Sequence, residues 1–109
     1  MESCDEIQPA GCPVELAISV FGSKWKLLIL RVILLNRAAR FNELLGAITS
    51  LSAKELTRNL KQLVSAGLLD HTGDQYQLSD EGKSLIPIFE AMRDWGMTRM
   101  NGLAEVTSR

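Results

Sequence analysis

Residues 52–78 carry the pattern that most restricts the fold of this chain: a strongly marked amphipathic helix followed at once by a short hairpin. Ser52-Ala53-Lys54-Glu55 fits a capping box, with Ser52 as the cap and Glu55 three residues on. The apolar residues that follow share one helical stripe, and Gly67 suits the position after the last turn; the stripe consists of Ala53, Leu56, Leu60, Leu63 and Val64. Two short strands, 68–72 and 75–78, are predicted next, joined by Gly73-Asp74.

Three further helices are predicted before this segment. The first starts at Pro13 with Cys12 as its cap and ends at Gly22, and its expected core stripe is Val14, Ala17, Ile18 and Phe21. The second follows its N-cap Ser23 and stops at Asn36, and it is apolar almost all round, as expected of a central buried helix. Residues 37–40 form a connector to a short third helix over 41–48, whose expected inward residues are Phe41, Leu44, Leu45 and Ile48.

The last helix is predicted to start after its cap Ser79 and to run to about Asn101. Pro87 predicts a kink inside it, or alternatively a helix that begins near Pro87. Four helices, a hairpin and a last helix make a mainly α fold with a small β-hairpin, which is the order of a winged helix-turn-helix. We expect one such domain over residues 12–101, a flexible N-terminal tail over 1–11 and a C-terminal tail over 102–109.

Composition agrees with a single small globular domain. The chain has 109 residues, of which 46% are hydrophobic and 23% charged. No stretch has the length and hydrophobicity of a membrane span, and the acidic N-terminal segment has no apolar signal region. The expected location is therefore the cytoplasm, where Cys4 and Cys12 should be reduced thiols.

Basic residues are concentrated in the middle of the chain. The net charge of the whole chain is −1, whereas residues 23–66 carry eight basic and two acidic residues, a net charge of +6. The segments before and after this region are both net acidic. Such a distribution allows one face of the protein to bind a polyanion such as nucleic acid.

The predicted helix over 52–67 has a polar side suited to DNA. At about 100° per residue, Arg58, Gln62 and Ser65 lie opposite Leu60, flanked by Lys54 and Lys61 with Thr57 at the border. Because the N-terminal part of a recognition helix reads base edges, the candidates for base contacts are Lys54, Thr57 and Arg58, with Gln62 suited to adenine. The candidates for phosphate contacts are Lys61, Arg40, Asn42 and the free amides near Ser52.

The last helix carries more apolar residues than a domain of this size needs for its core. Leu85, Phe89, Met92, Trp95 and Met100 recur at helical spacing, and the first helix adds Leu16 and Val20. Pairing these residues between two chains would bury the surplus in a symmetric interface and place two recognition helices about one DNA turn apart. The alternative is that the last helix folds back on its own core.

Four segments of this chain together resemble the HxlR-type regulators, which are relatives of the MarR winged-helix proteins. The segments are CPVELAISVFGSKWKLLIL, RFNEL, LSAKELTRNLKQLVSAGLL and YQLSDEGKSLIPIFEAMRDWG, which cover most of residues 12–96. The resemblance implies a homodimeric cytoplasmic regulator that binds a palindromic operator in double-stranded DNA. It also implies that Cys12 can sense electrophiles or oxidants, as the cysteine of the opening Cys-Pro does in some members. The hairpin departs from the family pattern, because it is short and has an acidic tip at Gly73-Asp74.

The residues themselves leave other functions open. A thiol at a helix N-terminus is activated by the helix, which favours a redox role for Cys12, although a small structural residue is the alternative. The sequence has no phosphate-binding glycine loop, paired acid motif or metal-binding cysteine spacing, so we expect neither an enzyme nor a cofactor. We expect a repressor, since the chain is too small for a further recruiting domain. The alternatives are a winged-helix module that binds protein and a regulator controlled by a small-molecule ligand at the dimer interface.

Overall fold

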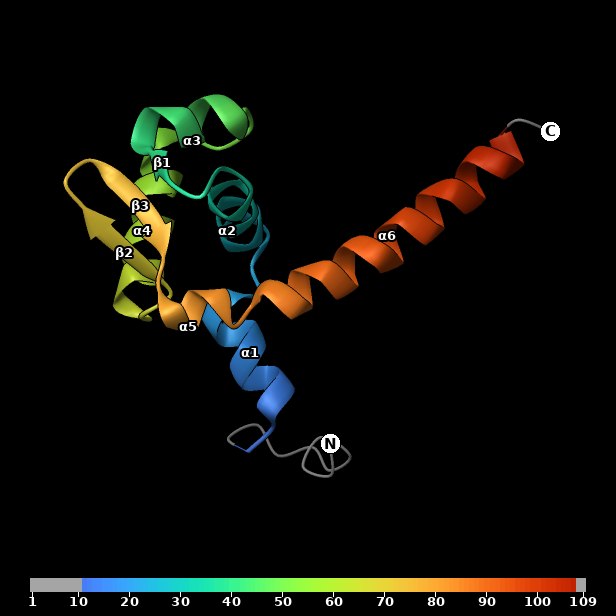
Figure 1. The fold of residues 1–109 in the computed structure, drawn as a ribbon, viewed down its shortest axis with the longest axis horizontal. Coiled ribbons are helices and arrows are strands. Elements are labelled where there is room, and N and C mark those ends of the chain that lie inside the picture. Colours follow the sequence, from blue (N-terminus) through green and yellow to red (C-terminus); the bar gives the residue numbers. More distant parts are fainter. Residues whose placement is uncertain (1–10, 108–109) are drawn as a thin grey trace.

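The computed structural model describes residues 11–107, and the side chains of residues 11–103. Nine elements follow one another in this part of the chain (Figure 1): α1 (Pro13–Phe21), α2 (Lys24–Asn36), β1 (Ala39–Arg40), α3 (Phe41–Ala47), α4 (Ala53–Ser65), β2 (Leu69–Thr72), β3 (Gln75–Leu78), α5 (Asp80–Lys83) and α6 (Ile86–Thr107). This order confirms the predicted winged helix-turn-helix. No helix within residues 11–107 is long and apolar enough to cross a membrane.

Local hydrogen bonds fix the starts and ends of the central helices. The Ser23 hydroxyl accepts from the Lys26 amide at 3.3 Å and begins α2, and the Ser52 hydroxyl accepts from the Glu55 amide at 3.1 Å and begins α4. Only this half of the predicted capping box forms at α4, because the Glu55 carboxylate binds Arg58 instead. Gly67 adopts φ +80° directly after α4, a left-handed conformation that glycine takes without steric cost.

A three-stranded antiparallel sheet of order β1-β3-β2 closes one side of the domain. The β2–β3 hairpin, which we call the wing, turns at Gly73-Asp74 as predicted, and Gly73 has φ +61°. The rings of His71 and Tyr76 stack across it with centroids 4.0 Å apart. Strand β1 was predicted only as a connector; its two residues pair with β3, Ala39 opposite Tyr76 and Arg40 opposite Gln75.

The core lies between α2, α3, α4 and the sheet. Its fully buried side chains come mainly from α2 and α4, which confirms α2 as the central helix; they include Ile29, Leu30, Ile33, Leu56, Leu60 and Leu63. Leu44 and Ile48 are buried as predicted, and Phe41 and Leu45 pack against the core from its edge.

The predicted core stripe of α1 is wrong for Val14 and Ile18, whereas Phe21 packs against the core as predicted. None of its residues is buried, and Val14 and Ile18 are 43% and 60% exposed. Val20, which was assigned to the opposite side, packs against the core together with Phe21. Figure 1 shows the reason: α1 lies outside the body formed by α2–α5, and only its C-terminal end meets that body.

The C-terminal segment confirms the alternative prediction, in which a separate helix begins near Pro87. Ser79 caps only the four-residue α5, by accepting from the Gly82 amide at 3.0 Å. Helix α6 then begins at Ile86, so Pro87 lies in its first turn, where the missing amide hydrogen leaves no hydrogen bond unmade. The helix continues to Thr107, beyond the predicted end near Asn101, and extends away from the body (Figure 1).

Gly82 should be hard to replace, because α5 packs directly on the backbone before β2. A Cβ atom at Gly82 would lie 2.2 Å from the Leu68 carbonyl oxygen, which also accepts from the Ser79 amide at 3.0 Å. We expect Gly82→Ala to lower the free energy of unfolding in urea by about 1–3 kcal/mol or more. Gly46→Ala is the control, since its Cβ meets nothing within 4 Å and should stabilise α3 by about 0.5–1 kcal/mol. Equal stability of Gly82→Ala and the wild type would contradict this packing.

Candidate DNA-binding site

Helix α4 presents one buried and one exposed side, as its sequence predicted. Leu56, Leu60 and Leu63 lie in the core, and the one buried polar side chain beside them, Asn59, donates to the Glu55 carbonyl at 2.7 Å. The other side of α4 is exposed, and we call it the basic face; it consists of Lys54, Thr57, Arg58, Lys61 and Gln62. The predicted recognition residues on α4 therefore share one solvent-facing surface.

The cations of the basic face differ in how they are held. Among the described residues, neither Lys54 nor Lys61 forms an ion pair, so both ammonium groups are available to a ligand. Arg58 is paired within α4, with its Nη2 atom 2.6 Å from Oε2 of Glu55. The Thr57 hydroxyl donates to the Ala53 carbonyl at 2.9 Å and can still accept a hydrogen bond.

Arg40 lies beside the wing. Its Nε atom is 3.1 Å from Oδ2 of Asp74, the acidic residue at the wing tip. The pairing of β1 with β3 brings the two together, because it sets Arg40 opposite Gln75. This contact was not predicted from the sequence, because β1 was not recognised as a strand. The acidic wing tip is thus partly neutralised by the chain's own arginine.

Ser52 and Asn42 occupy the N-terminal ends of helices. Ser52 is exposed and its hydroxyl is used as the cap of α4, so its contribution to an anion would come through nearby backbone amides. Asn42 is exposed in the first turn of α3, two residues after Arg40. In that turn the Glu43 carboxylate accepts from the Arg40 amide at 2.8 Å and fixes the backbone at the entry to the helix.

A second surface is apolar and runs along α6. Trp95 is 67% exposed, and exposed apolar side chains continue along one side of the helix; we call this set the α6 stripe, and it consists of Ile88, Met92, Trp95, Met100 and Leu103. Met97 is also exposed, on another side of the helix. Phe89 is half-buried against the core. Leu85 must be removed from the predicted interface, because it is 6% exposed and packs in the core of its own chain.

Helix α1 offers a smaller apolar surface. Leu16 is exposed, as the predicted interface requires, whereas Val20 is half-buried on the core. Val14 and Ile18 are exposed as well, on another side of α1 from Leu16, although their spacing suggested core positions. Helix α1 therefore leaves most of its apolar side chains exposed in the single chain.

Cys12 lies at the start of α1. It is the N-cap residue of the helix and half-buried, and its side chain makes no cap hydrogen bond. The structure holds Cys12 as a disulfide-bonded residue, which differs from the reduced thiol expected from the sequence. Cys4, the other cysteine of the chain, lies outside the described residues.

The fold and the basic face define a winged-helix DNA-binding protein. The family model for HxlR-like helix-turn-helix proteins matches residues 20–103, and the chain belongs to this family of DNA-binding transcription regulators.

Relatives of this chain carry matching descriptions. A helix-turn-helix transcriptional regulator of Methanothermobacter thermautotrophicus is 37% identical over 92 residues, which cover 78% of this chain and 70% of the relative. The redox regulator HypR in its reduced form is 29% identical with a TM-score of 0.75, over 86% of this chain and 99% of HypR. Quinone-bound YodB from Bacillus subtilis is 31% identical with a TM-score of 0.72, over 80% of this chain and 99% of YodB.

Proposed function

We propose that this regulator is a homodimeric repressor that reads a palindromic operator through the basic face of α4 and loses affinity for it when Cys12 is oxidised or modified. The observation that carries the proposal is the division of α4 into a fully buried leucine side and an exposed side with Lys54, Arg58 and Lys61. An exposed helix with three cations and a glutamine matches the hydrogen-bond acceptors of the major groove and its phosphates.

Selection of binding sites from random duplex DNA tests the operator. We expect an inverted repeat whose half-sites are centred about one helical turn apart, because two copies of α4 related by a twofold axis must reach successive major grooves on one side of the duplex. A single half-site without symmetry, or no enriched sequence, would contradict a dimeric reader.

Asp74 is expected to reduce the affinity for DNA, because its carboxylate repels phosphates and competes with them for Arg40 at 3.1 Å. An exposed ion pair contributes only about 0.2–1 kcal/mol, so Asp74→Asn should raise operator affinity about twofold to fivefold at low salt, and less at high salt. Fluorescence anisotropy of a labelled operator measures the change. Asp94→Asn removes the same charge from an exposed position on α6 and serves as the control. An unchanged or lower affinity of Asp74→Asn would show that Arg40 does not meet phosphate.

Dimerisation is supported by the α6 stripe. In one chain its large apolar side chains face solvent on a helix that extends away from the body (Figure 1), and exposed Leu16 adds to them from α1. A twofold pairing of these helices would remove the stripe from water and duplicate the basic face.

A redox role for Cys12 is supported by its position at the junction of the N-terminal segment and α1, one of the two proposed interface helices. HypR and YodB, the similar structures, are described in reduced and quinone-bound states. Diamide takes two electrons and two protons from two thiols and joins them as a disulfide, and a reductant reverses the reaction. Cys12 is disulfide-bonded in the structure, so reduction of this disulfide would free the start of α1 and change the relative placement of the two copies of α4.

Cys12→Ser is expected to abolish the response to oxidants. Operator affinity of the wild type should fall about tenfold or more between the protein kept in reductant and the protein treated with diamide, while Cys12→Ser keeps the affinity of the reduced state in both. Anisotropy under the two conditions measures the effect. The Cys4→Ser variant is tested in parallel. It distinguishes a disulfide between Cys12 and Cys4 from a mixed disulfide between Cys12 and a small thiol. Loss of binding by oxidised Cys12→Ser would remove Cys12 as the sensor.

A further inference from the structure

A groove of about 440 Å³ lies between α2, β3, α5 and the start of α6, and none of its lining residues belongs to the basic face or the α6 stripe. Its volume is within the range of small-molecule pockets, about 300–1,000 Å³. Four apolar residues from α2, β3 and α6 line it: Ile33, Leu34, Leu78 and Ile86. Ile33 is fully buried and the other three are half-buried, so the floor belongs to the core and the mouth is open.

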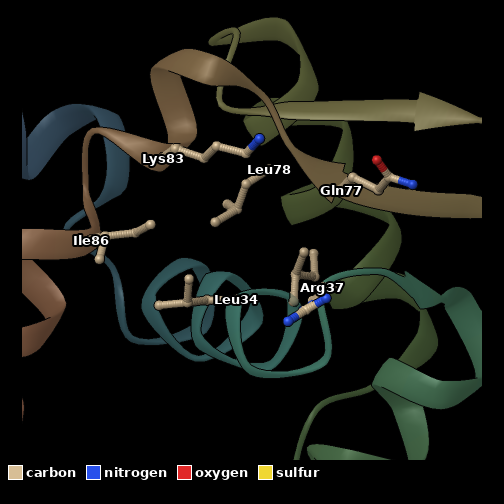
Figure 2. Close-up of a pocket in the computed structure, with 7 residues that line it drawn as sticks. Leu34, Arg37, Gln77, Leu78, Lys83 and Ile86 are labelled. Atoms are coloured by element: carbon tan, nitrogen blue, oxygen red, sulfur yellow. The ribbon is translucent and has the colours of Figure 1, made fainter.

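Two cations stand on opposite sides of this groove. Figure 2 shows Arg37 beside Leu34 on the α2 side, and Lys83 beside Leu78 on the facing side, with Ile86 at one end. Both are exposed, and among the described residues neither takes part in an ion pair. No acidic residue lines the groove, so the lining residues do not neutralise the positive charge of the two cations.

The backbone at Arg37 is strained. Arg37 is the C-cap of α2 with φ +68° and ψ −36°, and within residues 11–107 it is the one residue other than glycine with positive φ. Glycine is the residue that usually occupies such a position, because a Cβ atom raises the energy of the left-handed region. Strained conformations at pocket edges often serve binding, and here the strain accompanies a cation at the mouth of an apolar groove.

We propose that this groove binds a small amphipathic organic anion, namely a hydrophobic carboxylate, whose apolar part contacts Leu34, Leu78 and Ile86 and whose carboxylate is held by Arg37 and Lys83. An arginine fork and an ammonium group both form charge-assisted hydrogen bonds with a carboxylate, and a neutral ligand of the same shape forgoes them. The role of this ligand as an effector rests on the proposed function: the ligand would connect wing strand β3 to the start of the helix that carries the proposed dimer surface.

The test measures ligand binding without DNA, so its failure is distinguishable from failure of the proposed function. Backbone amide signals of the ¹⁵N-labelled full chain are followed during titration with phenylacetate, with octanoate, and with neutral phenylacetamide. We expect saturable shifts centred on Leu34, Leu78 and Ile86 with at least one carboxylate, and binding of phenylacetamide weaker by about tenfold.

Variants assign the charge to the two cations. Arg37→Gln and Lys83→Gln should each raise the dissociation constant about tenfold, whereas Arg31→Gln, which removes an exposed cation of α2 outside the groove, should leave it unchanged. Arg37→Gly relaxes the backbone while it removes the cation, and it should weaken binding as Arg37→Gln does. The proposal is overturned if neither carboxylate binds at millimolar concentration, if phenylacetamide binds equally well, or if Arg31→Gln weakens binding as much as Arg37→Gln.

Discussion

Replacement of Lys54 and Arg58 by alanine is expected to lower the affinity for the selected operator by about a hundredfold to a thousandfold, since each good base contact contributes about 1–3 kcal/mol of discrimination. Both residues lie in the N-terminal half of α4, the part of a recognition helix that reaches base edges, and both are exposed. The change leaves the buried side of α4 intact, so the thermal unfolding temperature should change little.

The ion pair between Arg58 and Glu55 does not oppose this role. It lies on the exposed surface of α4, where such a pair contributes about 0.2–1 kcal/mol, less than a bidentate contact to guanine. Arg58 can therefore leave Glu55 and bind a base edge at little cost in free energy. In the absence of DNA, the Glu55 carboxylate holds the Arg58 guanidinium on the basic face.

A matched variant separates a specific effect from loss of charge. Arg31→Ala with Arg93→Ala removes two exposed cations from α2 and α6 and leaves α4 unchanged. We expect it to reduce operator affinity only through the change in net charge, by less than about fivefold at moderate salt. If this control weakens binding as much as the α4 variant does, α4 does not read the operator.

Trp95→Asp is expected to convert the protein to monomers and to lower operator affinity by about a hundredfold or more, because the avidity gained from two linked half-sites is lost. Trp95 is 67% exposed in the single chain, so its replacement removes no core contact and the monomer should remain folded. In the proposed interface the new carboxylate would be buried without a partner, and an unpaired buried charge is strongly unfavourable. Sedimentation equilibrium measures the mass, and circular dichroism measures the helix content.

Asn101→Asp is the control for this experiment. At about 100° per residue, Asn101 lies on the side of α6 opposite the α6 stripe, and it is exposed. The Asn101→Asp variant introduces the same charge on the same helix and should leave the dimer and its operator affinity intact. A folded Trp95→Asp dimer would exclude the α6 stripe as the interface.

Much of this fold could be predicted from the sequence, namely those features that one local signal determines. Ser23, Ser52 and Gly67 mark helix ends through a hydroxyl or a left-handed backbone, and these signals depend on neighbouring residues alone. The leucines of α4 repeat at helical spacing on a helix with few other apolar residues, so the buried side was unambiguous. The basic face could then be predicted directly, because it is the side of α4 opposite the buried leucines.

Features that depend on distant residues could not be predicted in this way. Strand β1 has only two residues, too few to show a period, and it exists because Ala39 meets Tyr76 across the sheet. The pairing of Arg40 with Asp74 depends on that strand. Helix α1 has apolar residues on more than one side, so its spacing could not identify the side that faces the core. Leu85 fits the periodicity of α6, yet it lies before the helix and belongs to the core.

The most direct test of the central claim is the salt dependence of binding to the selected operator and to random duplex DNA, measured by anisotropy with reduced protein. If Arg40 and Lys61 of two protomers contact phosphates, the logarithm of affinity should fall with the logarithm of salt concentration with a slope of about −4 or steeper, and the operator should bind at least about a thousandfold more tightly than random DNA. A shallow slope and equal affinity for both duplexes would contradict the account and favour a winged-helix module that binds protein.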